Sequence, residues 1–158
     1  MIMIRPIQRH DEQMLKEMFW FCSEDSLYRR YLQSYNPTDD EIAQICAITP
    51  QEGAAFVAYM EKPHKAIVGM AYYIYDGENT AEPAVIVEDD YQSQGIGGRL
   101  LRSLFEEANQ RQLAAFNTYV LANNRPMVHM IRSSGLDYDC EMEYGTIHFK
   151  IWINRQAD

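Results

Sequence analysis

Apolar side chains recur three or four positions apart through the N-terminal part of the chain, which is the spacing of one helix face. This pattern predicts a helix over His10–Cys22. Ser23 and Thr38 are residue types that cap helix N-termini, and each precedes a further stretch with the same apolar spacing. We therefore predict three helices, preceded by a short strand over Ile2–Arg5 that Pro6 ends.

Beyond these helices the apolar spacing changes, and β-branched and aromatic residues fill short runs that turn residues separate. The turn at Asp76-Gly77-Glu78-Asn79 predicts an antiparallel pair of strands on either side of it. Two helices, over Gly95–Asn109 and Arg125–Ser133, interrupt the strands. The predicted strands of this region are Ala54–Met60, Ala66–Tyr75, Ala81–Val87, Phe116–Ala122, Tyr138–Glu143 and Thr146–Ile153.

These elements predict an α/β fold with a mixed, mostly antiparallel central sheet of about seven strands and helices on both faces. The 158 residues suffice for one hydrophobic core, and no repeat, low-complexity tract or linker divides them. We therefore expect a single domain over residues 1–158.

The formal net charge of −9 argues against non-specific nucleic-acid binding, which requires a basic face. Many acidic residues fall between Asp76 and Asp90, where we expect a solvated rim that attracts cationic partners. No apolar run is long enough for a membrane span, and the N-terminus lacks a secretory signal pattern. Cys22, Cys46 and Cys140 are far apart and predict reduced residues in or near the core of a cytoplasmic protein. No Cys/His cluster has metal-ligand spacing, so we expect no metal.

The segment from Gln92 to Gly98 is the strongest functional signal, because its glycines lie between a predicted strand and a predicted helix. Such a turn presents free N–H groups at the positive end of a helix dipole, which favours a phosphate group. A P-loop is excluded because Arg99 and Leu100 stand where Lys and Ser/Thr are required. A dinucleotide fingerprint is excluded because Leu100 replaces its third glycine and no acidic residue follows about twenty positions later.

The acyl-CoA pattern Gln/Arg-x-x-Gly-x-Gly/Ala does match, through Gln92, Gly95 and Gly97. An ordinary strand-to-helix turn is the alternative interpretation of these glycines. The order of the predicted elements, with this loop after the fourth strand, resembles the GNAT acyltransferase superfamily. Further segments that resemble the family are Ala81-Glu82, Asn123-Asn124-Arg125-Pro126-Met127 and Ser134-Gly135-Leu136, and Leu27–Leu32 is similar to the GNAT domain of bacterial protein-lysine acetyltransferases.

The resemblance implies that acetyl-CoA, as co-substrate, lies between the fourth and fifth strands. It assigns the pantetheine amides to the backbone of Val85 and Val87, and a further pantetheine or water contact to Asn124. Side-chain hydrogen bonds of Gln92 would support the loop, and Arg99 or Arg102 would reach the 3′-phosphate. The N–H groups that would hold the pyrophosphate belong to Gln92, Gln94, Gly95, Ile96, Gly97 and Gly98, where a Cβ at Gly95 or Gly97 would obstruct the phosphate.

The resemblance also implies direct attack of a primary amine on the thioester, which requires a base because a free lysine has a pKa of about 10.4. Glu82 is the candidate base, and Glu88 is the reserve. Ile131 stands where many family members carry a tyrosine general acid, so Tyr138 or water would protonate the thiolate.

The sequence thus predicts an N-acetyltransferase whose acceptor is a protein lysine or a small amine. The alternative is a non-catalytic acetyl-CoA-binding sensor or regulatory module. A homodimer is plausible for a soluble protein of this size.

Overall fold

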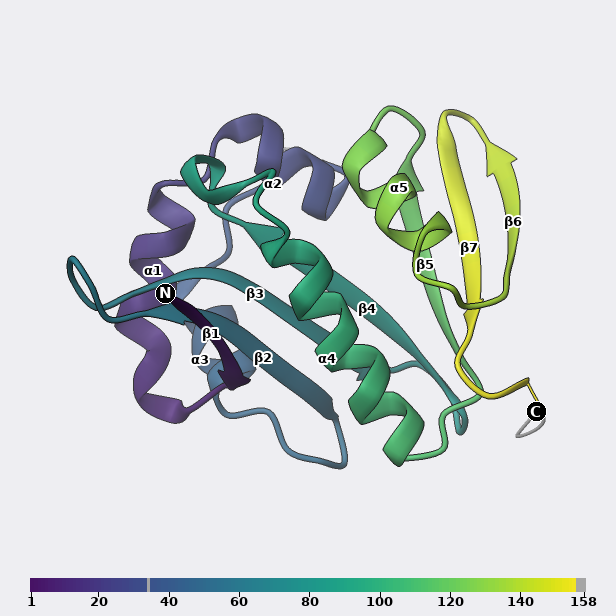
Figure 1. Ribbon diagram of the computed structural model, residues 1–158, viewed down its shortest axis with the longest axis horizontal. Coiled ribbons are helices and arrows are strands. Elements are labelled where there is room, and N and C mark those ends of the chain that lie inside the picture. The colour runs from purple at the N-terminus through teal and green to yellow at the C-terminus, as the bar shows by residue number, and fades with distance from the viewer. Residues whose placement is uncertain (34, 156–158) are drawn as a thin grey trace.

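The computed structural model describes residues 1–33 and 35–155 (Figure 1). In this part, seven strands form one sheet in the order β1-β2-β3-β4-β5-β7-β6. Every neighbouring pair of strands is antiparallel except β4 and β5, which are parallel. The strands are β1 (Ile2–Pro6), β2 (Gly53–Met60), β3 (Ala66–Tyr75), β4 (Thr80–Val87), β5 (Ala115–Leu121), β6 (Tyr138–Glu143) and β7 (Thr146–Trp152).

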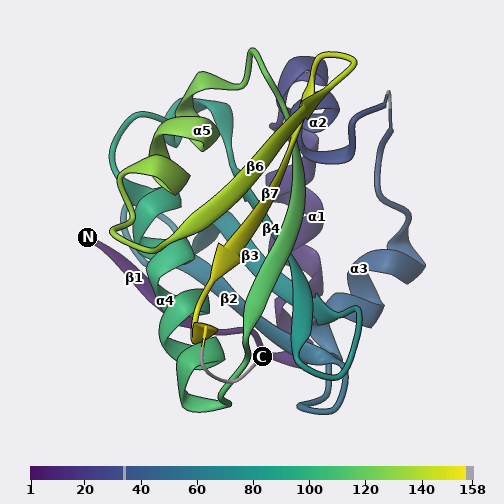
Figure 2. The ribbon, with the colours of Figure 1, turned by 90° about the vertical axis from the view of Figure 1, so that its right-hand side faces the viewer.

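Helices cover both faces of the sheet, as Figure 2 shows in a view turned by 90°. Helices α4 and α5 lie on one face, and α1, α2 and α3 lie on the other. The Ser23 and Thr38 hydroxyls accept the N–H groups of Ser26 and Glu41 at 3.1 and 3.2 Å, which confirms both predicted caps. The helices are α1 (Glu12–Trp20), α2 (Glu24–Tyr31), α3 (Asp39–Cys46), α4 (Ile96–Gln110) and α5 (Arg125–Arg132).

Each face of the sheet carries its own apolar core. Between the sheet and α4, the fully buried residues include Leu100, Leu104 and Phe116. Between the sheet and α1, they include Leu15 and Met18. Burying one such side chain stabilises the fold by roughly 1.5–3 kcal/mol. The middle of β3 is buried on both faces, which explains why that stretch is apolar with little alternation.

The predicted α/β sheet of about seven strands is confirmed, and most element ends move by one or two residues. The predicted helix over His10–Cys22 is wrong at its start, where a separate 3₁₀ turn, η1 (Arg9–Asp11), precedes α1. The Asp11 carboxylate accepts the N–H of Gln8 at 2.8 Å and so closes this turn.

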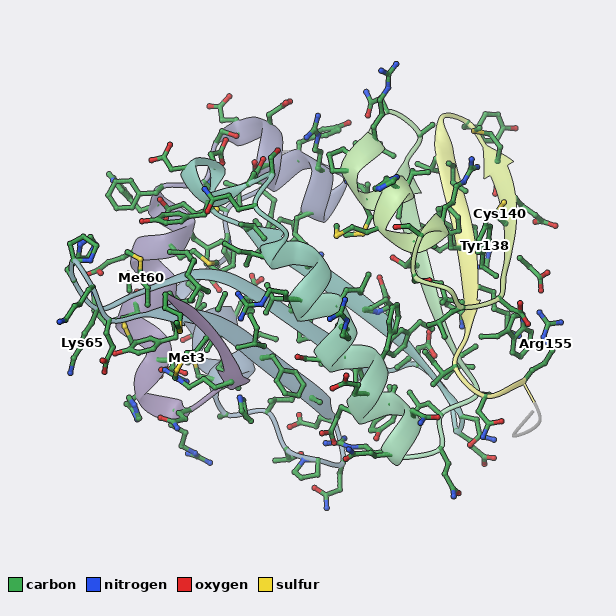
Figure 3. All side chains as sticks on the ribbon, in the orientation of Figure 1. Met3, Met60, Lys65, Tyr138, Cys140 and Arg155 are labelled. Carbon is green, nitrogen blue, oxygen red and sulfur yellow. The ribbon has the colours of Figure 1, made fainter. Side chains whose placement is uncertain are left out.

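One sequence-based expectation about burial is wrong, and another is refined. Cys140 is exposed rather than near the core, because the edge strand β6 has no helix over its outer side (Figure 3). The acidic residues between Asp76 and Asp90 are mostly exposed, as expected, but they lie in two places, because Asp76 lies at the β3–β4 turn and Asp89 lies beyond the other end of β4. Eight strand residues, at about 3.3 Å each, place those two ends roughly 25 Å apart.

No helix in the described residues is long and apolar enough to span a membrane.

An internal ion pair fastens the first strand to η1. The Arg5 guanidinium donates two hydrogen bonds of 2.9 Å to the Asp11 carboxylate, which is fully buried. Burial raises the pKa of this carboxyl, but the hydrogen bonds from Arg5 and from the Gln8 N–H outweigh burial and lower the pKa below its usual value.

We expect Asp11→Asn to lower the free energy of unfolding at neutral pH by about 2 kcal/mol, because Arg5 loses its charged partner. Since folding lowers this pKa, the stabilisation is present above the unfolded-state pKa of about 3.9 and disappears as pH falls through the folded-state value. Urea denaturation of both proteins at several pH values measures the difference. The difference in free energy of unfolding should shrink in acid. The control Glu106→Gln, on the exposed face of α4, should leave the free energy of unfolding nearly unchanged at every pH. A difference that stays constant with pH would contradict the lowered pKa.

Candidate functional site

A cleft opens within the sheet where β4 and β5 separate. The two strands pair only through Thr80 with Ala115 and Ala81 with Phe116, whereas the other edge of β5 pairs with β7 over the full length Ala115–Leu121. Figure 1 shows β4 and β5 diverging from that end toward the N-terminus of α4 and toward α5. The cleft has a volume of about 620 Å³ and is lined by residues of α2, β4, the glycine loop, β5 and α5.

The split leaves the cleft side of β4 without a strand neighbour beyond Ala81. Pro83 lies two residues later and has no N–H to donate to a neighbouring strand. Val85 and Val87 line the cleft along this edge, where the Val87 carbonyl already accepts a hydrogen bond from the Gln92 side chain. Unpaired backbone groups require partners, so this edge suits an extended ligand that carries amides.

The glycine loop forms one end of the cleft, where Gly95 is the N-cap of α4. Gly95 has a φ of +83°, a conformation that favours glycine. The N–H groups of residues 93–98 make no hydrogen bond within the described part of the chain. A Cβ added to Gly95 or Gly98 would meet no protein atom within 4 Å, whereas one at Gly97 would meet the Met130 sulfur at 3.2 Å. The loop therefore offers free N–H groups beside open space, which fits a phosphate group.

A hydrogen-bond network ties this loop to α2. The Gln92 Nε2 donates to the Val87 carbonyl at 2.9 Å and to the Ser26 hydroxyl at 3.0 Å. The Asp89 carboxylate accepts the Ser26 hydroxyl at 3.0 Å and the Ser23 N–H at 2.9 Å. Partial burial raises the pKa of Asp89, but the hydrogen bonds from Ser23 and Ser26 hold it below its usual value. The side chain of Gln92 thus makes the kind of bonds that the sequence suggested.

Glu82 lines the cleft near the point where β4 and β5 part, and its side chain is exposed. It lies directly opposite Ile74 of β3, and the pair Ala84 and Tyr72 follows along the same two strands. Directly opposed and alternate residues share one face of a sheet. Glu82 therefore projects on the face that carries α1, α2 and α3.

The remaining candidates divide between the cleft and the outside. Asn124 lines the cleft, and its Oδ1 accepts the Met127 N–H at 3.4 Å as the N-cap of α5. Gln94 does not line the cleft, and its side chain donates to the Asp90 carbonyl at 3.4 Å. Arg99 also lies outside, because its guanidinium donates to the Ile2 carbonyl of β1 at 2.9 Å. Arg102 does not line the cleft either, and the contact of Arg99 or Arg102 with a 3′-phosphate stays a prediction.

The substitute acid and the reserve base are not cleft residues. Tyr138 packs edge-to-face on Phe149 at a centroid distance of 5.7 Å on the β6–β7 hairpin (Figure 3). Glu88 is nearly buried outside the cleft, and burial together with Asp90 and Asp89 raises its pKa. Ile131 of α5 is buried in the same apolar core as Leu100 and Phe116. Within the described residues, no group of three or more His, Cys, Asp and Glu side chains could hold a metal ion.

Several polar or aromatic cleft residues had no site role predicted from the sequence, although three of them belong to the Leu27–Leu32 segment that resembles the family, because only the fold brings them to the cleft. The following five lie on the cleft walls away from the loop. They are Arg29, Arg30 and Tyr31 of α2, Tyr119 of β5 and His129 of α5.

Comparison with known proteins gives one consistent result. The family model described as "Acetyltransferase (GNAT) family" matches residues 13–136. The curated protein Acetyltransferase Pat of Mycolicibacterium smegmatis is 32% identical over 127 residues, which are 78% of this chain. This chain spans only 38% of that relative's length.

Solved structures share the fold. The GNAT domain of S. lividans PAT has a TM-score of 0.83 at 20% identity, covering 93% of this chain and 88% of that domain. The structure of yncA from Salmonella typhimurium with its cofactor acetyl-CoA has a TM-score of 0.78 at 18% identity, covering 99% of this chain and 96% of that protein.

The two outer glycines of the loop should respond oppositely to alanine. Gly95→Ala should lower the free energy of unfolding by about 1–2 kcal/mol, because alanine is strained at a positive φ. Gly98→Ala should raise it by roughly 0.5–1 kcal/mol, because this position is helical and a Cβ there meets nothing. Urea denaturation without ligand measures both variants, and equal shifts of the same sign would contradict this loop geometry.

Proposed function

This chain belongs to the GNAT acetyltransferase family, and on that premise we propose that it transfers an acetyl group from acetyl-CoA to a primary amine. The observation that carries the proposal is the cleft between β4 and β5, which joins an unpaired strand edge to a loop of free N–H groups. An extended ligand with amides at one end and phosphates at the other matches both features. Acetyl-CoA has that chemistry, and it supplies an activated acetyl thioester.

The binding half of the site follows from the backbone. We assign the pyrophosphate to the N–H groups of residues 93–98 at the positive end of α4. We assign the pantetheine amides to the β4 edge at Val85 and Val87, which has no neighbouring strand and where Gln92 occupies only the Val87 carbonyl. Gln92 holds the loop against the end of β4 and against α2, so its side chain acts by positioning. Asn124 fixes the start of α5 at the opposite wall of the cleft.

Glu82 is the proposed base. An attacking amine must be neutral, and its usual pKa of about 10.4 keeps it protonated at pH 7. The Glu82 carboxylate lines the cleft and is exposed, so it is accessible to the amine directly or through one water. We propose that solvent protonates the leaving thiolate. Tyr138 lies outside the cleft, and Ile131, at the position of the family's tyrosine, has no acidic proton.

We propose a protein lysine or a small primary amine as the acceptor. The relative called Acetyltransferase Pat and the fold neighbour called the GNAT domain of PAT support an acetyltransferase of this general kind. Free cysteines in the described chain fit a reducing cytoplasmic compartment, which is the location we propose.

The first prediction concerns binding. Titration calorimetry should show micromolar affinity for acetyl-CoA and CoA and much weaker binding of NADPH. Gln92→Leu should weaken acetyl-CoA binding roughly tenfold, because it removes two hydrogen bonds worth about 1 kcal/mol each at most. Gln94→Leu is the matched control, since its side chain lies outside the cleft. Preferred binding of NADPH would overturn the phosphate-loop assignment.

The second prediction concerns chemistry. Glu82→Gln should lower kcat/KM for the amine by about 10²–10³ at neutral pH and leave acetyl-CoA affinity unchanged. The rate should recover partly at high pH, where more of the amine is neutral. Glu78→Gln, in the exposed β3–β4 turn, is the control. Wild-type turnover by Glu82→Gln would exclude Glu82 as the base, and binding without any turnover by the wild type would favour a non-catalytic acetyl-CoA-binding module.

A further inference from the structure

The second half of α2 brings positive charge to the cleft. Arg29, Arg30, Tyr31 and Leu32 all line it. The Arg30 guanidinium donates a hydrogen bond to the Tyr72 hydroxyl and lies over the rings of Tyr31 and Tyr72, 4.5 and 5.2 Å from their centroids. Two aromatic contacts and one hydrogen bond therefore fix the position of this partly buried cation.

Arg30 forms no ion pair with any carboxylate of the described residues. The other well-fixed arginines do, since Arg5 pairs with Asp11 and Arg111 pairs with Glu107. Arg29 also lines the cleft without an ion pair, but within the described residues only Arg30 of the two has its guanidinium fixed by a hydrogen bond and aromatic rings. A guanidinium has five N–H donors in a planar fork, and the contact with Tyr72 uses only one atom of it.

Strand register places Arg30 near the proposed base. Tyr72 pairs with Ala84, and Ile74 pairs with Glu82, so all four residues lie on one face of the sheet. Ala84 and Glu82 are two residues apart on β4, a spacing of about 7 Å. Tyr72 therefore anchors the Arg30 guanidinium on the same face as Glu82 and close to it along the strand.

The same register separates Arg30 from the phosphate loop. Val87 ends β4 three residues beyond Ala84, or about 10 Å farther along the strand, and the loop begins beyond it. The anchored cation is thus nearer to the base end of the cleft than to the phosphate end. A group that binds Arg30 would belong to the acceptor rather than to the pyrophosphate.

We propose that the amine acceptor carries a carboxylate close to its reacting amine, and that Arg30 binds this carboxylate through its free N–H groups. The inference rests on the proposed acetyl transfer and narrows its acceptor class. The guanidinium fork matches a carboxylate in two-point hydrogen bonding, and the tyrosine rings keep the fork in place. Arg30 thereby sets which amine lies beside Glu82, and it takes no part in the proton transfer.

Paired acceptors test the proposal. One arm uses linear ω-amino acids of increasing length and their carboxamides, and the other uses lysine peptides in which the neighbouring residue is Glu or Gln. Release of CoA measures transfer, and calorimetry in the presence of CoA measures binding of the same probes. The wild type should prefer the carboxylate over its amide roughly ten- to hundredfold in acceptor KM or Kd. A preference among the ω-amino acids would identify a small-molecule acceptor, and a preference among the peptides would identify a protein lysine beside an acidic residue.

The variants locate the effect. Arg30→Gln should bring the preference for the carboxylate close to one and leave the Kd of acetyl-CoA unchanged. Arg30→Lys should keep part of the preference, because the charge remains while the planar fork is lost. Arg132→Gln is the control, since Arg132 is exposed and outside the cleft. Circular dichroism checks that each variant folds. If Arg30→Gln does not fold, the proposal is judged from the preference of the wild type for carboxylate over carboxamide probes and from the change of that preference in Arg30→Lys.

Two results would overturn the inference. One is equal use and equal binding of carboxylate and carboxamide probes by the wild type. The other is an unchanged preference in Arg30→Gln together with weaker acetyl-CoA binding, which would place Arg30 on the cofactor. Carboxylate-dependent binding without transfer to any probe would instead count against the proposed acetyl transfer and leave the anion site standing.

Discussion

The parallel pairing of β4 with β5 ends after two residue pairs, and the whole site depends on that interruption. A continuous sheet would satisfy the backbone groups of β4 with those of β5 and leave no space between the strands. Because the strands part, the middle of the sheet contains an edge of β4 without a strand neighbour and a cleft of about 620 Å³ that residues of both faces line. Backbone groups without a partner raise the free energy of the fold. Here they lie along the cleft, where hydrogen bonds to the amides of a ligand can offset that destabilisation.

The second requirement is that the glycine loop and α2, which form two walls of the cleft, are bonded to each other. Ser23 and Ser26 at the start of α2 bond to Asp89, and Ser26 also accepts the amide of Gln92. The loop that offers N–H groups to a phosphate is thereby fastened to the helix that carries Arg30. A single short network links the part of the site that would bind acetyl-CoA to the part that would meet the acceptor.

Charge within the cleft is distributed by the fold and not by the composition. The chain is acidic overall, yet the acidic residues that cluster in sequence lie at opposite ends of β4. Glu82 is the carboxylate on the cleft wall beside the strand opening, and Arg30 is a cation without a carboxylate partner in the described chain. A carboxylate and a guanidinium on one face suit an acceptor that carries both an amine and an acid.

The sequence by itself determined the elements, because local rules fix them: apolar spacing, caps at Ser23 and Thr38, and glycines at a strand-to-helix turn. It also put Glu82 in the fourth strand and Gln92 with the glycine loop between that strand and the next helix. It could not show that Arg99 bonds to β1, that Cys140 is exposed or that Tyr138 packs on Phe149, since whether a side chain faces a cleft, a neighbouring strand or solvent depends on packing partners far away in the chain. Only the tertiary structure inserted β7 between β5 and β6, parted β4 from β5 and brought Arg30 against Tyr72. Those contacts join residues tens of positions apart, and no local pattern encodes them.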